Sequence, residues 1–431
     1  MQEYCIILFK VLNGAQSRPV GRDRATTWNG SRRPRPGAGR HPTRWRPAGG
    51  TRPEAPRPTR YGPAAGTPQG RVQLTRQEYL RRQKEELGRK VCGVFPAQYP
   101  KEILWALGLA PAEIWDPPLA SEQAAAHLQP YICSVVRQGL ELLMQGQAGV
   151  CDAFLFPHTC DSIQNLASVV NDYIGLDKPC YFFYHPKAPY GPPARAYYLE
   201  QLKSLALALE PLAGPLDLAE LKRRVAQGQE VARLHGQIYH RRAKGELNCS
   251  NAAFYQAVRQ GEYLFPDDLI PFLEGFLAGA GGHAPRGQRV LLSGVLPNPP
   301  EILSLLDDLG VAVAADDFLA CSRRYLFAPS ASSDPWQALS EQYFALPPCS
   351  SKGSPIQERL DYLLASAEQS GAKGVIFYLV KFCEPELFDV PILTEELKKR
   401  GLPCLALDVE INQGLSGQMA TRVEAFLEML G

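Results

Sequence analysis

Gly374-Val-Ile-Phe-Tyr-Leu-Val380 is the stretch that decides the fold, because an uninterrupted apolar run of this length is typical of a strand buried on both faces of a sheet. Lys381-Phe-Cys383-Glu-Pro385 follows it, and a helix-like pattern comes next at 394–400. A strand, a short loop and a helix in this order form one unit of an open α/β sheet. Because ligands of such sheets bind beyond the carboxyl ends of the strands, we expect Cys383 to lie at a crevice.

Two further cysteines have the same kind of placement. Asp152-Ala-Phe-Leu-Phe-Pro157 predicts a second buried strand, and His158-Thr-Cys160-Asp161 leads from it into a helix-like stretch. Cys133, in Tyr131-Ile-Cys-Ser-Val-Val-Arg137, also follows a segment that should end at a crevice. The three cysteines are therefore candidates for one shared binding site.

Strand and helix signals alternate from residue 90 to the C-terminus, and a helical middle from Arg195 to about Leu277 divides them into two groups. We therefore expect an α/β fold with two doubly wound, Rossmann- or flavodoxin-like domains joined by a helical region. The expected segments are a first α/β domain at 73–205, a helical region at 206–285 and a second α/β domain at 286–431. Strands are expected at 90–95, 152–157, 180–184, 289–293, 311–315, 374–380 and 404–408.

The composition is that of a chain with large buried cores. It has 431 residues, 45% of them hydrophobic, and no apolar stretch approaches the roughly 20 residues that a membrane-spanning helix needs. The run Cys5-Ile-Ile-Leu-Phe9 is too short for the core of a signal peptide. Eleven cysteines without an export signal indicate a reducing compartment, in which thiols bind metals or take part in catalysis. We expect a cytoplasmic protein that does not associate with membranes.

The net charge of +2 combines two unlike segments. Residues 1–72 hold 14 Lys and Arg against 3 Asp and Glu, which leaves a net charge of −9 for residues 73–431. The Arg-, Pro- and Gly-rich segment lacks apolar periodicity, so we expect it to be disordered, or untranslated if the start codon is assigned too far upstream. The alternative is a basic arm for nucleic acid, but no binding fold accompanies it, and we expect no nucleic-acid partner.

Nucleotide and zinc motifs are absent. The chain has no G-x-x-x-x-G-K-[ST] loop, so it should not bind ATP by itself. It has no C-x-x-C pair, and its seven histidines show no ligand spacing, so zinc is a poor fit. His158, two residues before Cys160, is a candidate proton donor, and the alternative is an ordinary polar loop residue.

Five blocks of the chain resemble, in the same order, those of the 2-hydroxyacyl-CoA dehydratase/benzoyl-CoA reductase subunit family, of the 2-hydroxyglutaryl-CoA dehydratase D-component type. They are Phe95-Pro-x-x-Tyr99, the block around Cys133, His158-Thr-Cys160-Asp161, Ala315-Asp-Asp-Phe-Leu-Ala-Cys-Ser-Arg323 and Lys381-Phe-Cys383-Glu-Pro-Glu386. The last block, followed by Gly401-Leu-Pro-Cys-Leu-Ala-Leu-Asp408, is the most specific. The resemblance implies a [4Fe–4S] cluster bound by Cys133, Cys160 and Cys383, with the fourth iron open to substrate or solvent.

The resemblance also implies an activity and partners. A lyase of this family removes water from a 2-hydroxyacyl-CoA through a ketyl radical, which forms when one electron enters the thioester. Its partners are a homologous second subunit or a second copy of the chain, and a separate ATP-hydrolysing iron–sulfur activator, in anaerobic metabolism. The alternatives are an ATP-dependent reductase of the same family and a subunit that only relays electrons.

Three polar residues near these cysteines are candidates for catalysis. Asp161, Glu384 and His158 could transfer protons or hydrogen-bond near the cluster. Asp161 and Glu384 fit equally well as carboxylates that satisfy backbone N–H groups at the start of a helix.

One position departs from the family pattern. Many members have a cysteine where this chain has Leu319, and Cys321 falls where the family often has glycine. Cys321 is therefore an extra ligand, a redox thiol or a packed small residue. With Cys151 and Cys349 it would complete a six-thiolate set of the kind that binds a double-cubane cluster, which is the alternative cofactor.

Overall fold

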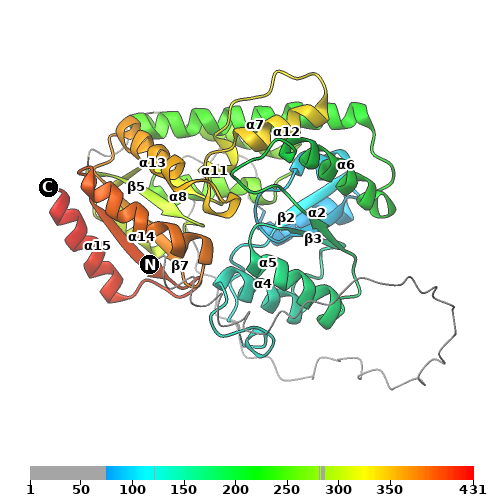
Figure 1. Ribbon diagram of the computed structural model, residues 1–431, viewed down its shortest axis with the longest axis horizontal. Coiled ribbons are helices and arrows are strands. Elements are labelled where there is room, and N and C mark those ends of the chain that lie inside the picture. The colour runs from blue at the N-terminus through cyan, green and yellow to red at the C-terminus, as the bar shows by residue number, and fades with distance from the viewer. Residues whose placement is uncertain (1–73, 121, 281, 283–286) are drawn as a thin grey trace, which may run out of the picture. The chain divides into compact units, whose positions relative to one another are not determined.

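Two four-stranded parallel sheets form the centre of the fold (Figure 1). The computed structural model describes residues 74–120, 122–280, 282 and 287–431, all of which belong to one compact unit. The strand order is β2-β1-β3-β4 in the first sheet and β6-β5-β7-β8 in the second. The strands are β1 (Lys90–Val94), β2 (Leu109–Glu113), β3 (Ala153–Pro157), β4 (Cys180–Phe183), β5 (Arg289–Gly294), β6 (Ala312–Phe318), β7 (Gly374–Val380) and β8 (Cys404–Val409). The α/β class is confirmed, and the arrangement is consistent with two doubly wound domains.

Helices connect the parallel strands, as the crossover from one parallel strand to the next requires. The α-helices are α2 (Arg76–Glu85), α3 (Lys101–Ala106), α4 (Ser134–Met144), α5 (Asp161–Ser168), α6 (Ala194–Ala213), α7 (Leu218–Lys244), α8 (Asn251–Val258), α9 (Pro266–Gly279), α10 (Glu301–Asp308), α11 (Ser322–Tyr325), α12 (Pro335–Ala345), α13 (Ile356–Ser370), α14 (Glu384–Lys399) and α15 (Gly417–Leu430). The short helical turns are η1 (Ala124–Ala126), η2 (Val169–Ile174), η3 (Arg259–Glu262) and η4 (Ser350–Lys352). None of the described helices is both long enough and apolar enough to cross a membrane.

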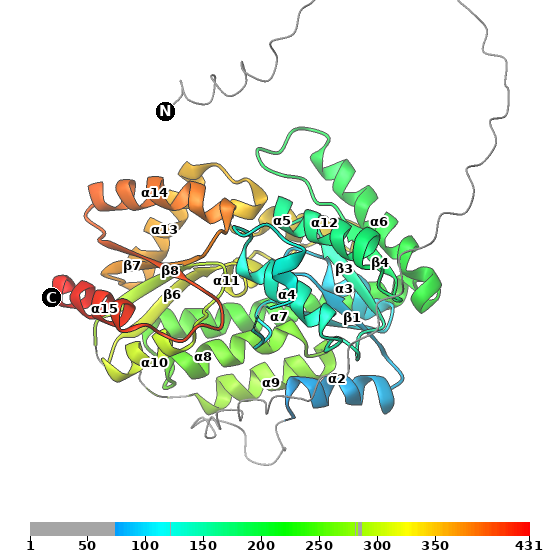
Figure 2. The same cartoon turned by 90° about the horizontal axis from the view of Figure 1, so that it is seen from below.

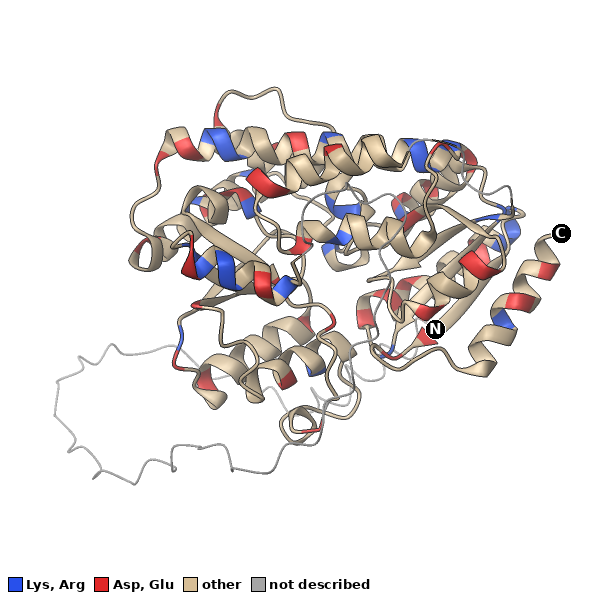
Figure 3. Cartoon of the chain, turned by 180° about the vertical axis from the view of Figure 1, so that it is seen from behind, with Lys and Arg blue, Asp and Glu red and all other residues tan. Residues whose placement is uncertain are grey.

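The central strands β3 and β7 are buried on both faces, which explains their uninterrupted apolar runs. All seven residues of β7 are buried. Ile376 and Tyr378 belong to the largest core, whereas Val375 and Phe377 belong to a second core with residues of α13 and α14. In the first sheet, Phe154 of β3 faces the largest core and its neighbour Leu155 faces a third core on the other side. Charged residues are accordingly few on the strands and are spread over the helices, as Figure 3 shows.

Helices α6 to α9 occupy the segment between β4 and β5, where a helical middle is expected. Its longest helix, α7, starts at Asp217, whose carboxylate accepts a hydrogen bond from the N–H of Ala219, and ends at Gly245 with φ of 72°. Helix α7 contacts α3, the helix that connects β1 and β2 of the first sheet, and it also contacts β6 of the second sheet (Figure 1). The helical region therefore packs against both sheets.

Strand β2 is a strand that the sequence patterns did not predict. Leu109-Ala-Pro-Ala-Glu113 contains a proline and no β-branched residue, so its strand propensity is low. The strand lies at the edge of its sheet, the position in which a missing N–H donor is tolerated. The expected features of residues 1–72, and Cys5 with them, lie outside the described residues.

Candidate functional site at three cysteines

The three predicted cysteines line one cavity, although up to 250 residues separate them in the chain. The rest of the cavity wall is largely apolar. It consists of Pro96, Trp115, Val135, Val136, Thr159, Ile163, Val295, Leu319, Ser350, Ser351, Pro385 and Glu386. The three thiols are therefore grouped in a mostly apolar wall.

The cavity lies at the carboxyl ends of strands from both sheets. In each sheet the strand order reverses between two neighbouring strands, β1 and β3 in the first and β5 and β7 in the second. Pro96 and Cys160 follow β1 and β3, and Val295 and Cys383 follow β5 and β7. The reversal point of an open α/β sheet is where such folds bind ligands. Cys160 and Cys383 both line the cavity, after the strands that they were expected to follow.

Each of the three cysteines is the N-cap residue of a helix. Cys133 precedes α4, Cys160 precedes α5 and Cys383 precedes α14, so the helices come from both sheets (Figure 2). Free N–H groups and the helix dipole make a helix N-terminus favourable for negative charge. Three helix N-termini at one cavity therefore stabilise the thiolate form of these cysteines, or a negatively charged group that the thiolates bind.

The protonation of the thiols follows from their contacts. A hydrogen bond from Cys383 lowers the pKa of Cys133, and the same bond, together with burial, raises the pKa of Cys383. Burial raises the pKa of Cys160 to about 11, although backbone N–H groups of α5 oppose this shift. Because metals bind the thiolate form, metal binding at these cysteines would release protons.

A buried network of charges holds the segment that follows Cys383. Glu386 accepts hydrogen bonds from Arg323 (2.7 Å), Arg359 (3.3 Å) and the Ser350 hydroxyl (2.7 Å). Arg323 also pairs with Asp317 at 2.6 Å, and the four charged side chains are at most 2% exposed. Burial alone would raise the pKa of Glu386, but the two guanidinium groups hold it at about 2. Glu386 therefore lines the cavity as a carboxylate.

Asp317, Arg323 and Glu386 lie within the sequence blocks named above, but no role of their own was predicted for them. The signal that could have indicated them is charge of both signs within otherwise apolar blocks, since buried charges are normally paired. Arg359 carries no such signal, because it lies in the ordinary amphipathic helix α13.

The Thr159 hydroxyl is one of the groups that hold the loop before Cys160. The Thr159 hydroxyl donates to the carbonyl oxygens of Pro96 (2.8 Å) and Ala97 (3.1 Å), which ties the loop after β3 to the loop after β1. Ala97 and Gln98 have φ values of 85° and 57°, in the left-handed region that residues other than glycine seldom adopt. Backbone strain of this kind often occurs at functional sites.

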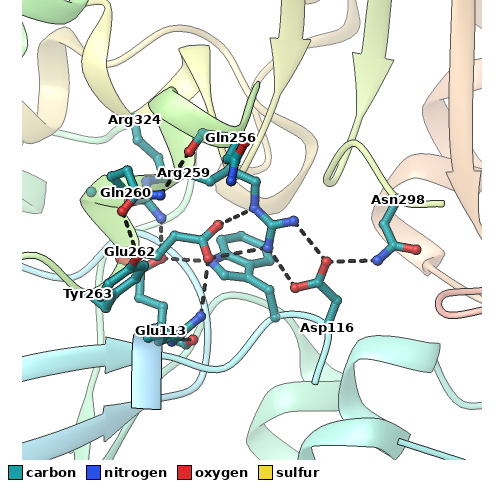
Figure 4. A network of polar contacts seen from close by, with 12 residues as sticks. Glu113, Asp116, Gln256, Arg259, Gln260, Glu262, Tyr263, Asn298 and Arg324 are labelled. Carbon is teal, nitrogen blue, oxygen red and sulfur yellow. Dashed lines mark hydrogen bonds and ion pairs between the residues drawn. The ribbon is translucent and has the colours of Figure 1, made fainter. Parts of the chain in front are cut away.

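A second polar network, which includes Glu113, Asp116, Arg259 and Asn298 (Figure 4), contacts the cavity-lining residue Trp115. The Trp115 indole N–H donates to Glu113 at 2.7 Å. Asp116 accepts two hydrogen bonds from Arg259, at 2.8 and 2.6 Å, and one from Asn298 at 2.8 Å. The first sheet, the helical region and the loop after β5 are thereby joined next to the cavity wall.

The candidate catalytic residues lie away from the cavity wall. The Asp161 side chain is 87% exposed, and Glu384 is also exposed. The His158 imidazole packs edge-on against Tyr184 and lies 3.6 Å from Asp161, and burial lowers its pKa. None of the three is among the residues that line the cavity, and their catalytic roles stay predictions.

The three additional cysteines are also outside the cavity wall. Cys321 and Cys151 are buried in the largest core. Cys349 is fully buried and lies closest to the site, because its sulfur is 3.4 Å from an Arg323 nitrogen and its neighbour Ser350 lines the cavity. A six-thiolate set stays a prediction.

Across the described residues, no three His, Cys, Asp or Glu side chains surround a position for a single metal ion. A cluster differs from an ion, because each thiolate binds a different iron and the sulfurs stay farther apart. The donor set fits a cluster, since three thiols and no carboxylate other than the paired Glu386 face the cavity.

Comparisons with known proteins agree with these features. Residues 96–430 match the family described as 2-hydroxyglutaryl-CoA dehydratase, D-component. The (R)-phenyllactyl-CoA dehydratase beta subunit of Clostridium sporogenes is 23% identical, over 82% of this chain and 95% of that one. The beta subunit of (R)-2-hydroxyglutaryl-CoA dehydratase from Acidaminococcus fermentans is 25% identical, over 80% and 93%. A subunit of benzoyl-CoA reductase from Thauera aromatica is 26% identical, over 76% and 87%. The chain belongs to the 2-hydroxyglutaryl-CoA dehydratase D-component family.

Proposed function

We propose that this chain is the iron–sulfur subunit of a 2-hydroxyacyl-CoA dehydratase, with a [4Fe–4S] cluster bound by Cys133, Cys160 and Cys383. The observation that carries the proposal is that these three cysteines, each at a helix N-terminus, line one cavity. Two of the relatives are beta subunits of dehydratases that act on 2-hydroxyacyl-CoA compounds.

When bound, the cluster supplies an electron at low potential and an iron open to the thioester or hydroxyl oxygen of the substrate. The residues of the chain provide the surroundings. Apolar side chains such as Val136, Ile163 and Leu319 exclude water from the cavity, which protects a reactive radical from side reactions. Glu386 keeps its charge in the arginine pair and holds the start of α14 in place.

We also propose the partners that such a reaction requires. The relatives are named as single subunits of larger enzymes, which implies partner subunits, and a homologous second subunit or a second copy would serve here. A separate ATP-hydrolysing iron–sulfur activator would deliver the electron, since this chain has no phosphate-binding loop. We place this anaerobic reaction in the cytoplasm. We also infer that the domains are flavodoxin-like, because the strand order of both sheets is the one found in flavodoxin-like folds.

A reductase is the second candidate, because a subunit of benzoyl-CoA reductase is among the relatives. A dehydration returns the electron, so catalytic amounts of reductant suffice for many turnovers. A reduction consumes electrons in proportion to product. Measuring the reductant used per product, with activator and ATP present, separates the two, and stoichiometric consumption would remove the dehydratase.

The cluster is tested by iron analysis of protein purified without oxygen. The wild type should hold about four irons per chain. Single Ser replacements of Cys133, Cys160 and Cys383 should each remove most of the iron. Cys249→Ser is the matched control, since Cys249 is also partly buried but lies outside the cavity wall. Full iron retention in all three ligand variants would disprove the assignment.

A further inference from the structure

Lys187 connects two loops at the cysteine cavity. Its ammonium group donates to the carbonyl oxygens of His158 (2.9 Å), Thr159 (2.7 Å) and Ser351 (2.7 Å). An ammonium has three donors, so all of them are used. The residue as a whole is exposed, yet its charged end is turned inward. Ordering a long side chain costs conformational entropy, so the inward position depends on these three bonds.

The two loops belong to different sheets. His158 and Thr159 lie between β3 and Cys160, whereas Ser351 lies in η4 of the second domain and lines the cavity. The next residue strengthens the connection, because the Ala188 N–H donates to the Lys352 carbonyl at 2.7 Å. The Lys187 segment of the first domain is thus fastened to η4.

The charge of Lys187 is directed at the thiol site. All three bonded partners are neutral carbonyls, so no bonded carboxylate cancels the charge. Burial lowers the pKa of Lys187 to about 8, which leaves the amine protonated at neutral pH. The Thr159 carbonyl, which accepts one of these bonds, belongs to the residue directly before Cys160, so the charge lies beside that part of the site.

We infer that Lys187 is a positioning residue of the cysteine site, which fastens the Cys160 loop to η4 and holds a positive charge beside the bound cluster. The part that concerns charge rests on the proposed function. A nearby positive charge stabilises the reduced, more negative state of a cluster and therefore raises its reduction potential. The fastening of the loop is a property of the protein without a cluster as well.

Three variants separate the bonds from the charge. Lys187→Met removes both, and Lys187→Arg keeps the charge. Lys178→Met is the matched control, because the Lys178 ammonium also donates to three carbonyls, those of Ala148, Gly149 and Cys151, none of which lines the cavity. Amide hydrogen exchange of cluster-free protein, followed by mass spectrometry, reports on the loops. A redox titration of cluster-loaded protein, followed by electron paramagnetic resonance, reports the potential.

In Lys187→Met, residues 158–164 lose two hydrogen bonds, and the net contribution of each corresponds to about a fivefold change, so exchange there should be at least about fivefold faster. In Lys178→Met this segment should exchange as in the wild type, and exchange should instead increase at 148–152. The reduction potential should be more negative in Lys187→Met and close to wild type in Lys187→Arg and Lys178→Met.

Wild-type exchange at both 158–164 and 350–353 in Lys187→Met would overturn the fastening of the loop. An unchanged potential in a cluster-loaded Lys187→Met protein would overturn the charge effect. If neither wild type nor variants take up iron, the proposed function fails, and the exchange measurements still decide whether Lys187 positions the loop.

Discussion

The two sheets hold their cysteines at the same topological position by different interactions. Cys160 follows β3 and Cys383 follows β7, and these strands occupy equivalent places in the two strand orders. The loop before Cys160 is held by a hydroxyl and an ammonium that bond backbone carbonyls, as Thr159 and Lys187 do. The segment after Cys383 is held by fully buried ion pairs around Glu386.

This difference shows that topology sets where a ligand loop lies but not the chemistry that holds it. A neutral hydrogen bond that is lost leaves a polar group that water can partly reach. A buried ion pair that loses one member leaves an uncompensated charge in the interior. The segment after Cys383 should therefore respond more strongly than the loop before Cys160 to removal of a single partner.

The largest effect is expected for Arg323→Met. Glu386 and Asp317 would lose one of their two shared arginine partners while they remain buried, and unfolding should become easier by about 3–5 kcal/mol. Urea unfolding of cluster-free protein gives the measurement. Arg233→Met is the control, since Arg233 pairs with Glu230 at the surface, and its unfolding midpoint should stay near the wild type. Equal midpoints for the two variants would contradict the comparison.

The second-largest effect is expected from acid, which should weaken the ion pairs of Glu386. The folded pKa of Glu386 is about 2, below the value near 4.5 of a free glutamate, so its contribution is fully present above pH 4.5 and is lost as the pH falls toward 2. The difference corresponds to about 3 kcal/mol at most. Urea midpoints measured between pH 6 and pH 3 should fall more steeply in the wild type than in Glu386→Gln. Parallel curves would show that Glu386 does not carry this dependence.

A smaller effect is expected for Thr159→Val in the first domain. The variant removes the hydroxyl that donates to the Pro96 and Ala97 carbonyls, at a cost of about 1–2 kcal/mol. Thr394→Val is the matched control, because the buried Thr394 hydroxyl oxygen has no hydrogen-bond partner among the described residues and its loss should not destabilise the protein. Unfolding of both variants in urea provides the measurement. A larger loss in Thr159→Val than in Arg323→Met would reverse the order proposed for the two segments.

The fold could be predicted in large part because its strands carry a local signal. Strands buried on both faces must be apolar throughout, so the runs at 153–157 and 374–380 are visible without any tertiary contact. Edge strand β2 is also buried along its whole length, but a proline, small alanines and a glutamate gave no strand signal. The placement of Cys160 and Cys383 at a crevice followed from the same local patterns, because a cysteine directly after a buried strand lies at the carboxyl end of a sheet.

The sequence by itself therefore determined the α/β class, the two groups of strands and the three cysteines of one candidate site. Only the tertiary structure decided what surrounds those thiols. Arg323 and Glu386 are 63 residues apart, and Lys187 and Ser351 are 164 apart, so no periodicity links either pair. Periodicity reports how a segment meets a nearby surface, whereas an ion pair or a bond to a distant carbonyl depends on the three-dimensional path that brings its two ends together.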